Sequence, residues 1–216
     1  MKIKKYPQSC VMITKGKTKI LVDPGKLKYD EKYFNEWKTA TAIFVTHKHG
    51  DHCNNEVIAK LDLPIYSTDE VQKAYPELKI NIIKQNDNFT IGNFKIEVVK
   101  AVHGFTPKMK GSNAEVFENI GFIFNDGNTK AYFTSDTICF NNDYKADYII
   151  APLSGNCVTM DSVGCALYAK MVGAKKLIIV HFDSYELPKD AETILKEQNI
   201  DCIIPKLESE IKLERS

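Results

Sequence analysis

Apolar residues in the first half of the chain gather in short runs that are typical of β-strands. Two of these runs, Ser9–Thr14 and Thr18–Val22, flank Lys15-Gly16-Lys17, which predicts a hairpin. The compact apolar run Ala42–Thr46 is expected to be a buried strand. Further strands are predicted at Pro64–Ser67, Asn81–Lys84, Phe94–Val102, Gly121–Asn125 and Lys130–Thr134, and short helices at Asn55–Leu61 and Asp69–Tyr75.

The second half of the chain alternates strands with helices. A helix is predicted at Asp161–Val172, because apolar residues recur there at helical spacing and Gly173 is placed to cap its end. The face predicted to be buried carries Val163, Ala166, Leu167, Lys170 and Met171. The other predicted elements are strands Tyr148–Ala151, Leu177–Val180 and Asp201–Ile204, and a helix Pro188–Gln198 with Pro188 in its first turn. Strands followed by covering helices predict an α/β protein with mixed sheets between helical layers.

Composition narrows the class of protein. The chain has 216 residues, 44% of them hydrophobic and 26% charged, which is typical of a globular protein and predicts one domain over residues 1–216. The net charge of +1 offers no field for nucleic acid or an anionic membrane. No apolar run reaches the length of a membrane span, the start lacks a secretory h-region, and the six cysteines form no C-x-x-C pair. We therefore predict a cytoplasmic protein with free thiols, and the N-terminal lysines predict a lysine-rich surface.

The strongest local signal is the run Thr46-His47-Lys48-His49-Gly50-Asp51-His52. It places four side chains that can bind a metal, His47, His49, Asp51 and His52, within six residues. Imidazole and carboxylate are the ligands that suit zinc, iron or manganese. A loop that leaves a strand can curl so that these side chains converge, and Gly50 is expected to supply the backbone freedom for the curl. The run predicts a metal site.

The remaining metal-binding side chains follow other strands. The chain has five histidines, and the two outside the run, His103 and His181, each come where an apolar strand stops. Asp136 and Asp23 are placed in the same way, after Ala131–Ser135 and after Ile20–Val22. Because ligand sites in α/β proteins lie at the carboxyl ends of strands, we expect these side chains to meet the histidine run at one edge.

These features together resemble the metallo-β-lactamase superfamily. The resemblance rests on the H-x-H-x-D-H run, a lone downstream histidine, Ser135-Asp136-Thr137 after a strand, and a final histidine at the end of a strand. It implies a four-layered αββα metallo-β-lactamase sandwich with mixed sheets. The run Ala151–Asp161, followed by a helix and Val180-His181-Phe182, is similar to the branch of metal-dependent hydrolases that includes ascorbate-6-phosphate lactonase. Ser135 and Ser154 stand where that branch is expected to have glycine.

The resemblance also implies a role for each residue of the site. His47, His49 and His103 would hold one divalent metal ion, and Asp51, His52 and His181 a second, with Asp136 bridging the two. Zinc is the first expectation for both ions, with manganese or iron as alternatives. Asp23 would be a carboxylate that orients a ligand histidine or, alternatively, a simple turn former in Asp23-Pro24-Gly25.

The expected activity is hydrolysis of a small ester, lactone or phosphoester by a metal-bound hydroxide, because a bound metal ion lowers the pKa of water from about 15.7 toward roughly 7. Asp51 and Asp136 are the candidate catalytic residues, and Asp51 could also accept a proton. A small-molecule substrate is the expected partner, and the chain could form a homo-oligomer. The polar segment Gly104–Phe117 could form a lip over the site, where Lys108 and Lys110 could attract an anionic group or could simply be solvated.

Several alternatives stay open. One is a phosphodiesterase or ribonuclease of the same superfamily, although nucleic acid is disfavoured because the chain is nearly neutral and has no segment long enough to clamp RNA. Another is a non-catalytic metal-binding protein. Hydrolysis of β-lactams and oxygen reduction at a diiron site are disfavoured, the first because no secretory leader is present. Cys53, next to His52, could face the site or pack as a buried thiol.

Overall fold

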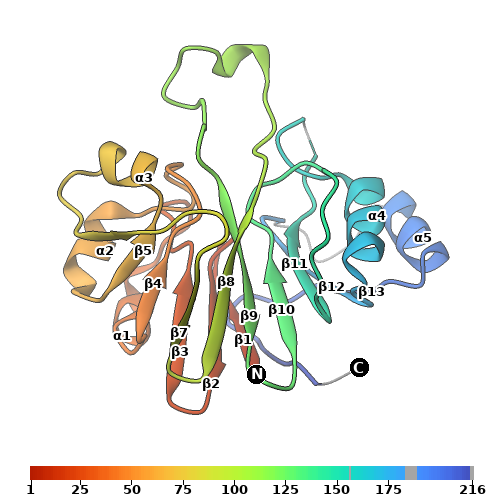
Figure 1. Ribbon diagram of the computed structural model, residues 1–216, viewed down its shortest axis with the longest axis horizontal. Helices are drawn as coiled ribbons and strands as arrows, with labels where there is room; N and C mark the ends of the chain where they lie inside the picture. Colours follow the sequence, from red (N-terminus) through yellow and green to blue (C-terminus); the bar gives the residue numbers. More distant parts are fainter. Residues whose placement is uncertain (156, 183–188, 215–216) are drawn as a thin grey trace.

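In the computed structural model, which describes residues 1–155, 157–182 and 189–214, two β-sheets pack face to face with helices on their outer sides (Figure 1). In the described residues each sheet has seven strands. The first has the order β14 (Glu210–Lys212), β1 (Lys2–Lys5), β2 (Val11–Lys15), β3 (Thr18–Val22), β4 (Ala42–Phe44), β5 (Ile65–Ser67), β6 (Ile80–Ile82). The second has the order β13 (Asp201–Ile203), β12 (Lys176–Val180), β11 (Tyr148–Pro152), β10 (Lys130–Phe133), β9 (Ile120–Asn125), β8 (Phe94–Lys100), β7 (Asn88–Ile91).

The two sheets share one pattern of strand directions. In the first sheet β14, β1, β2 and β3 pair antiparallel, and β3, β4, β5 and β6 pair parallel. In the second sheet β7, β8, β9 and β10 pair antiparallel, and β10, β11, β12 and β13 pair parallel. The mixed sheets predicted from the sequence are confirmed. The shared pattern puts the carboxyl ends of β3, β4, β8, β10 and β12 at one edge of the sandwich.

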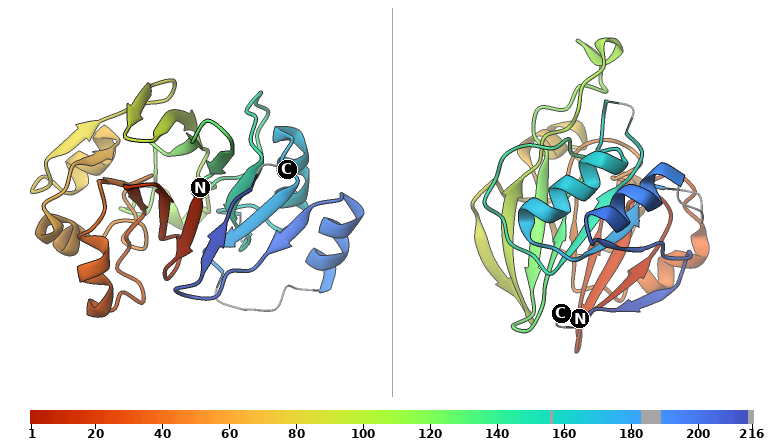
Figure 2. Two further views of the ribbon diagram at one scale, coloured as in Figure 1. Left: turned by 90° about the horizontal axis from the view of Figure 1, so that it is seen from below. Right: turned by 90° about the vertical axis from the view of Figure 1, so that its right-hand side faces the viewer.

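Apolar side chains fill three layers around the sheets. The inner layer, between the sheets, holds buried aromatic rings such as Phe44, Phe122 and Phe133, each stabilising the fold by about 1.5–3 kcal/mol. A second layer, with Trp37, lies under α1 (Phe34–Trp37), α2 (Asn55–Leu61) and α3 (Asp69–Ala74). A third, with Tyr168, lies under α4 (Ser162–Val172) and α5 (Lys189–Glu197), which cover the second sheet (Figure 2). This is the αββα arrangement that the resemblance implied.

The helix α4 buries only part of the face that was predicted: Ala166 is buried and Met171 is partly buried against the core. Its ends agree with the prediction, since the Asp161 side chain accepts a hydrogen bond from the backbone N–H of Gly164 and Gly173 has the left-handed φ of 77°. Val163 and Leu167, however, are 46% and 52% exposed. The face that packs against the sheet is a stripe of small and aromatic side chains, namely Cys165, Ala166, Tyr168, Ala169 and Val172.

Other predictions need smaller corrections. Strands β1, β7 and β14, the helix α1 and the short 3-10 helix Glu31–Tyr33 were not predicted, because they are short and carry little apolar periodicity. Lys5 does not belong to a lysine-rich surface: it is buried, and its Nζ donates to the carbonyls of Tyr6 and Gln8. Pro188, predicted to begin a helix, lies outside the described residues.

A long connection between β8 and β9, residues 101–119, rises beyond the edge where the strands end (Figure 1). We call its outer part, Gly104–Glu118, the arm. It contains one short 3-10 helix, Pro107–Met109, and its first residue is bound to the opposite loop by a hydrogen bond from the Gly104 N–H to the Val158 carbonyl, at 2.8 Å. Among the described residues, no helix combines the length and apolarity needed to cross a bilayer.

Candidate metal centre

Five strands deliver the predicted site residues to one edge of the sandwich. Asp23 directly follows β3 and His181 directly follows β12, while His47, His103 and Asp136 come three residues after β4, β8 and β10. The polar side chains converge because the carboxyl ends of these strands lie together at one edge. The placement at strand ends predicted from the sequence is therefore what the structure contains.

The histidine run curls as expected, but the glycine that the close packing of the curl requires is Gly25 and not Gly50. The backbone N–H groups of His52 and Cys53 both donate to the His49 carbonyl, at 3.0 and 2.9 Å, which closes the turn. Gly50 has an ordinary negative or extended φ, and an added Cβ would only touch the Lys26 side chain at 3.8 Å. At Gly25, by contrast, an added Cβ would lie 1.8 Å from the Asp51 carbonyl oxygen. The segment after β3 therefore packs directly against the loop and supports Asp51.

The side chains form two adjacent clusters, each compact enough to surround one ion. His47, His49 and His103 form the first cluster, and Asp51, His52, Asp136 and His181 form the second. Within each cluster, one nitrogen or oxygen atom per residue lies within 4.8 Å of all the others. The clusters touch, since the ring centroids of His47 and His52 are 4.1 Å apart. All seven residues predicted from the sequence are thus brought together, and Asp136, which the resemblance implied would bridge the two ions, lies in the second cluster.

Outer hydrogen bonds fix which ring nitrogen each histidine turns inward. His52 donates from Nδ1 to Asp23 Oδ2 at 2.7 Å, and His103 donates from Nδ1 to the Gly104 carbonyl at 2.7 Å. His49 does so in the opposite sense, with Nε2 donating to the Ala114 carbonyl of the arm at 2.9 Å. Each bond turns the other nitrogen of the ring toward the cluster. Such outer partners are what metal-binding histidines ordinarily have.

Asp23 extends this control to the first cluster through Thr46. Its carboxylate is fully buried and accepts from the Thr46 N–H and from Thr46 Oγ1, both at 2.8 Å. Because the Thr46 hydroxyl proton is used there, Thr46 Oγ1 is left to accept from His47 Nδ1 at 3.0 Å. One buried carboxylate thus orients a histidine in each cluster. Of the two interpretations of Asp23, the orienting one agrees with these contacts.

Several buried atoms in the clusters have no hydrogen-bond partner within the described part of the chain, namely His52 Nε2, His103 Nε2 and Asp136 Oδ1. The second oxygen, Asp136 Oδ2, lies 3.3 Å from His52 Nε2 and 3.5 Å from His181 Nε2. Buried polar atoms without partners are costly, by about 1–3 kcal/mol each, and need an explanation. Nitrogen and carboxylate oxygen atoms aimed at one point are the donor set of a divalent cation, so these residues fit a metal ion.

The pKa values of the cluster residues are shifted in both directions. Burial, together with the neighbouring His52 and His49, holds the pKa of His47 well below its usual value, so its ring is neutral at pH 7. Burial likewise lowers the pKa of His103. For Asp136, burial opposes ionisation, but the charge and hydrogen bond of His52 outweigh it and lower the pKa of the carboxyl. For His52 and His181 burial also lowers the pKa, but the charges and hydrogen bonds of the neighbouring aspartates outweigh burial and raise the pKa. Because neutral imidazoles and ionised carboxylates are the forms that bind metals, these two rings would have to lose a proton to an incoming ion.

Three residues around the site were missed by sequence reasoning. Thr46 adjoins the histidine run and could have been found as a polar residue at a strand end. The Ala114 carbonyl and the Asn119 side chain, which donates from Nδ2 to the Asp136 carbonyl at 2.6 Å, had no local signal, because their contacts span 65 and 17 residues. Long-range contacts of this kind appear only once the fold is known.

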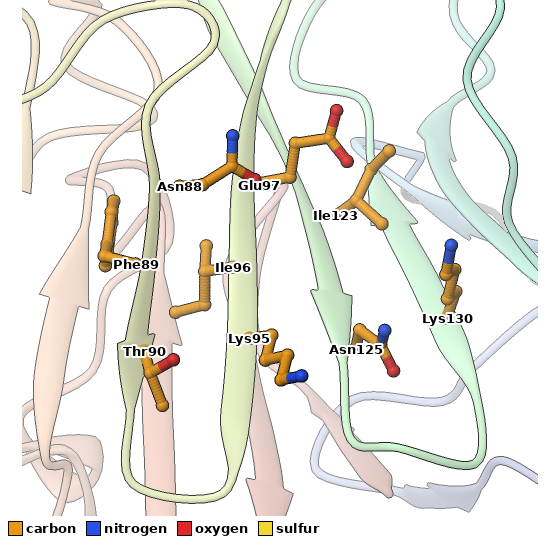
Figure 3. A pocket seen from close by; sticks show the side chains of 9 residues that line it. All are labelled: Asn88, Phe89, Thr90, Lys95, Ile96, Glu97, Ile123, Asn125 and Lys130. Carbon is orange, nitrogen blue, oxygen red and sulfur yellow. The ribbon is translucent and has the colours of Figure 1, made fainter.

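The other candidate residues lie away from the clusters. Cys53 is fully buried among the apolar residues under α2, so it is a packed thiol. Lys108 and Lys110 are exposed on the arm. A hollow of about 320 Å³ lies on the outer face of β7–β10, with Lys95, Glu97 and Lys130 at its margin (Figure 3). It contains no residue of either cluster, and it is not the site predicted from the sequence.

Comparison with known proteins agrees with this geometry. The family described as "Beta-lactamase superfamily domain" matches residues 2–181. A UPF0173 metal-dependent hydrolase of Listeria welshimeri is 29% identical over 206 residues, covering 87% of each chain. A crystal structure from Parabacteroides distasonis, described as a candidate metal-dependent hydrolase, has a TM-score of 0.79 at 25% identity and covers 95% of this chain and 92% of its own.

A more distant structure shares the fold alone. Igni18, a metallo hydrolase of Ignicoccus hospitalis, has a TM-score of 0.78 at 16% identity and covers 99% of this chain and 98% of its own. The narrower resemblance to ascorbate-6-phosphate lactonase stays a prediction. The family match covers all four strands that carry the clusters and ends at His181. By this match the chain belongs to the metallo-β-lactamase superfamily, among the relatives of the UPF0173 metal-dependent hydrolases.

Proposed function

We propose that the protein hydrolyses a small ester, lactone or phosphoester with the help of two divalent metal ions. His47, His49 and His103 would hold one ion, and Asp51, His52 and His181 the other, with Asp136 between them. The observation that carries the proposal is the pair of adjacent clusters, in which His52 Nε2, His103 Nε2 and Asp136 Oδ1 have no hydrogen-bond partner in the described part of the chain. The absence of thiolate from both clusters favours zinc, manganese or iron over softer metals, and zinc is the first choice.

The chemistry at this edge would combine the ions with the protein's own side chains. Bound divalent ions supply a water of lowered pKa and positive charge that stabilises a developing oxyanion. Asp136 is almost fully buried between His52 and His181, so its carboxylate is held within the second cluster. Asp51 is more open, with 22% of its side chain exposed, and its Oδ2 accepts from His181 Nε2 at 3.0 Å.

Asp51 is better suited to bind a metal ion than to accept a proton. Burial opposes its ionisation, but the hydrogen bond from His181 and the charge of His52 outweigh burial and hold the pKa of Asp51 far below its usual value. A base this weak accepts a proton inefficiently at neutral pH. We therefore assign it first to the metal and only second to proton transfer.

The arm borders the site, and its residues favour a small molecule as the substrate. The Ala114 carbonyl bonds to His49, which brings the arm against the first cluster, and Phe105 and Phe117 of the arm are 49% and 76% exposed. Lys108 and Lys110 are exposed on the same arm and could meet one anionic group of a substrate. A net charge of +1 argues against a phosphate-backbone track, so RNA is disfavoured as a substrate. Self-association remains a prediction.

The test is a substrate panel with a matched inactive variant. Zinc- or manganese-loaded protein is assayed on phosphorylated sugar lactones, a chromogenic phosphodiester, simple esters and a structured precursor RNA. We expect turnover of a small substrate that chelator abolishes and that Asp136→Ala lacks. Specific RNA cleavage that exceeds small-substrate turnover and is lost in Asp136→Ala would make the protein a nuclease, whereas cleavage that persists in the variant would come from a contaminant.

A further inference from the structure

The turn that carries Asp136 contains an unusual serine. Ser135 has a φ of 62°, in the left-handed region that favours glycine, and it is only 2% exposed. A serine here holds the backbone in a strained conformation beside a proposed metal ligand. Such strain persists only where surrounding contacts enforce it.

Those contacts come from Asn119, the residue that joins the arm to β9. Ser135 Oγ donates to Asn119 Oδ1 at 2.6 Å, and Asn119 Nδ2 donates to the Asp136 carbonyl at 2.6 Å. Asn119 is 8% exposed, so both bonds form away from solvent. The amide therefore bridges the side chain of one residue and the backbone of the next, and it closes a ring around the Ser135–Asp136 peptide. This ring fixes the direction in which the Asp136 side chain leaves the backbone.

The same serine reaches the first cluster. Its Oγ lies 3.4 Å from His47 Nδ1, on the side where Thr46 Oγ1 also accepts. Since the serine proton is used by Asn119, the oxygen presents lone pairs to the His47 ring. Ser135 thus contacts a residue of the first cluster while its neighbour Asp136 belongs to the second.

We propose that Ser135 and Asn119 form a positioning pair that fixes the Asp136 carboxylate, and with it the metal affinity of the site. This proposal rests on the proposed metal-dependent function. The proposal makes a specific prediction about residue type: at position 135, alanine should weaken zinc binding more than glycine does. Alanine keeps the strained φ and loses the hydrogen bond, whereas glycine loses only the hydrogen bond. A role in packing alone would give the opposite order, because glycine removes more buried volume.

The experiment measures zinc affinity by competition with a chromogenic chelator and, separately, the melting temperature of the metal-free protein. For Asn119→Ala and Ser135→Ala we expect zinc to bind about 10–100-fold more weakly at the Asp136-dependent step. Ser135→Gly should weaken binding less than Ser135→Ala. The double variant Asn119→Ala/Ser135→Gly should bind within about threefold of Asn119→Ala, because both changes break one shared bond.

The matched control is Asn93→Ala. Asn93 makes an equivalent bond, accepting from Thr18 Oγ1 at 3.0 Å, but at the β7–β8 hairpin, which is the far end of β8 from His103. It should lower the melting temperature without changing zinc affinity. If Asn119→Ala and Ser135→Ala bind zinc within twofold of wild type, or if glycine at position 135 is worse than alanine, the pair is refuted while the proposed function stands. A wild-type protein that takes up neither zinc nor manganese refutes both.

Discussion

Removing the charge of Asp23 should weaken both halves of the metal centre at once. The carboxylate accepts three hydrogen bonds, from the Thr46 N–H, Thr46 Oγ1 and His52 Nδ1, at 2.7–2.8 Å. In Asp23→Asn one oxygen can still serve the Thr46 N–H. The amide NH₂ then faces the Thr46 hydroxyl and the His52 N–H, so donors meet donors. His52 can restore a bond only by moving its proton to Nε2, the atom that faces Asp136.

The magnitude follows from the bonds lost. Hydrogen bonds to a charged group contribute about 1.5–3 kcal/mol each, so losing two should lower the free energy of unfolding by about 3–6 kcal/mol. For a chain of this size that corresponds to a fall in melting temperature of about 6–24 °C. Loss of an outer hydrogen bond to a ligand histidine should also weaken metal binding by about 10–100-fold.

The assay pairs thermal denaturation of the metal-free protein with chelator competition for zinc. Asp62→Asn is the matched control, because Asp62 is exposed at the end of α2 with a left-handed φ of 52° that asparagine tolerates. It should leave both measurements nearly unchanged. The reasoning is refuted if Asp23→Asn binds zinc within twofold of wild type, whatever its melting temperature.

The remaining predictions concern Thr46, Gly25 and Gly50. Thr46→Val keeps the shape but removes the oxygen that accepts from His47 at 3.0 Å, so calorimetry should record weaker binding at one zinc step and little change at the other; equal weakening at both steps would argue against the relay. Gly25→Ala places a methyl group 1.8 Å from a backbone carbonyl and should cost about 3 kcal/mol or more in urea unfolding, because backbone cannot yield easily. Gly50→Ala meets only a lysine side chain at 3.8 Å and should cost about 1 kcal/mol or less, and a larger loss there would restore the original interpretation of Gly50.

The metal centre was more predictable from the sequence than its supports. His103, Asp136 and His181 could be placed because each follows an apolar strand, and strands in α/β proteins end at a common edge. The contacts of Asn119 and Ala114 could not be predicted, because nothing local marks a backbone carbonyl or an amide as the partner of a residue 17 or 65 positions away. Ser135 was noticed only as a departure from glycine, and its φ explains why glycine is the expected residue.

Helices and strands could be predicted where the apolar periodicity is strong, and the prediction failed where the periodicity is weak. The ends of α4 followed from Asp161 and Gly173, yet its buried face was predicted only in part, because Val163 and Leu167 are more hydrophobic than the small residues that fit against the sheet. Burial of a helix face depends on the shape of its partner, which hydrophobicity alone does not contain. Strands at the sheet edges, such as β7 and β14, were missed because they are short and half exposed. The single domain over residues 1–216 stays a prediction.

The measurement that tests the central claim most directly is the metal content of the intact protein. Wild-type protein is stripped with chelator, reloaded with zinc or manganese, freed of excess metal and analysed for elements, with Asp136→Ala treated in parallel. The two clusters predict close to two ions per wild-type chain and clearly fewer in the variant. Wild-type protein that retains only traces of metal after reloading with each ion would contradict the account.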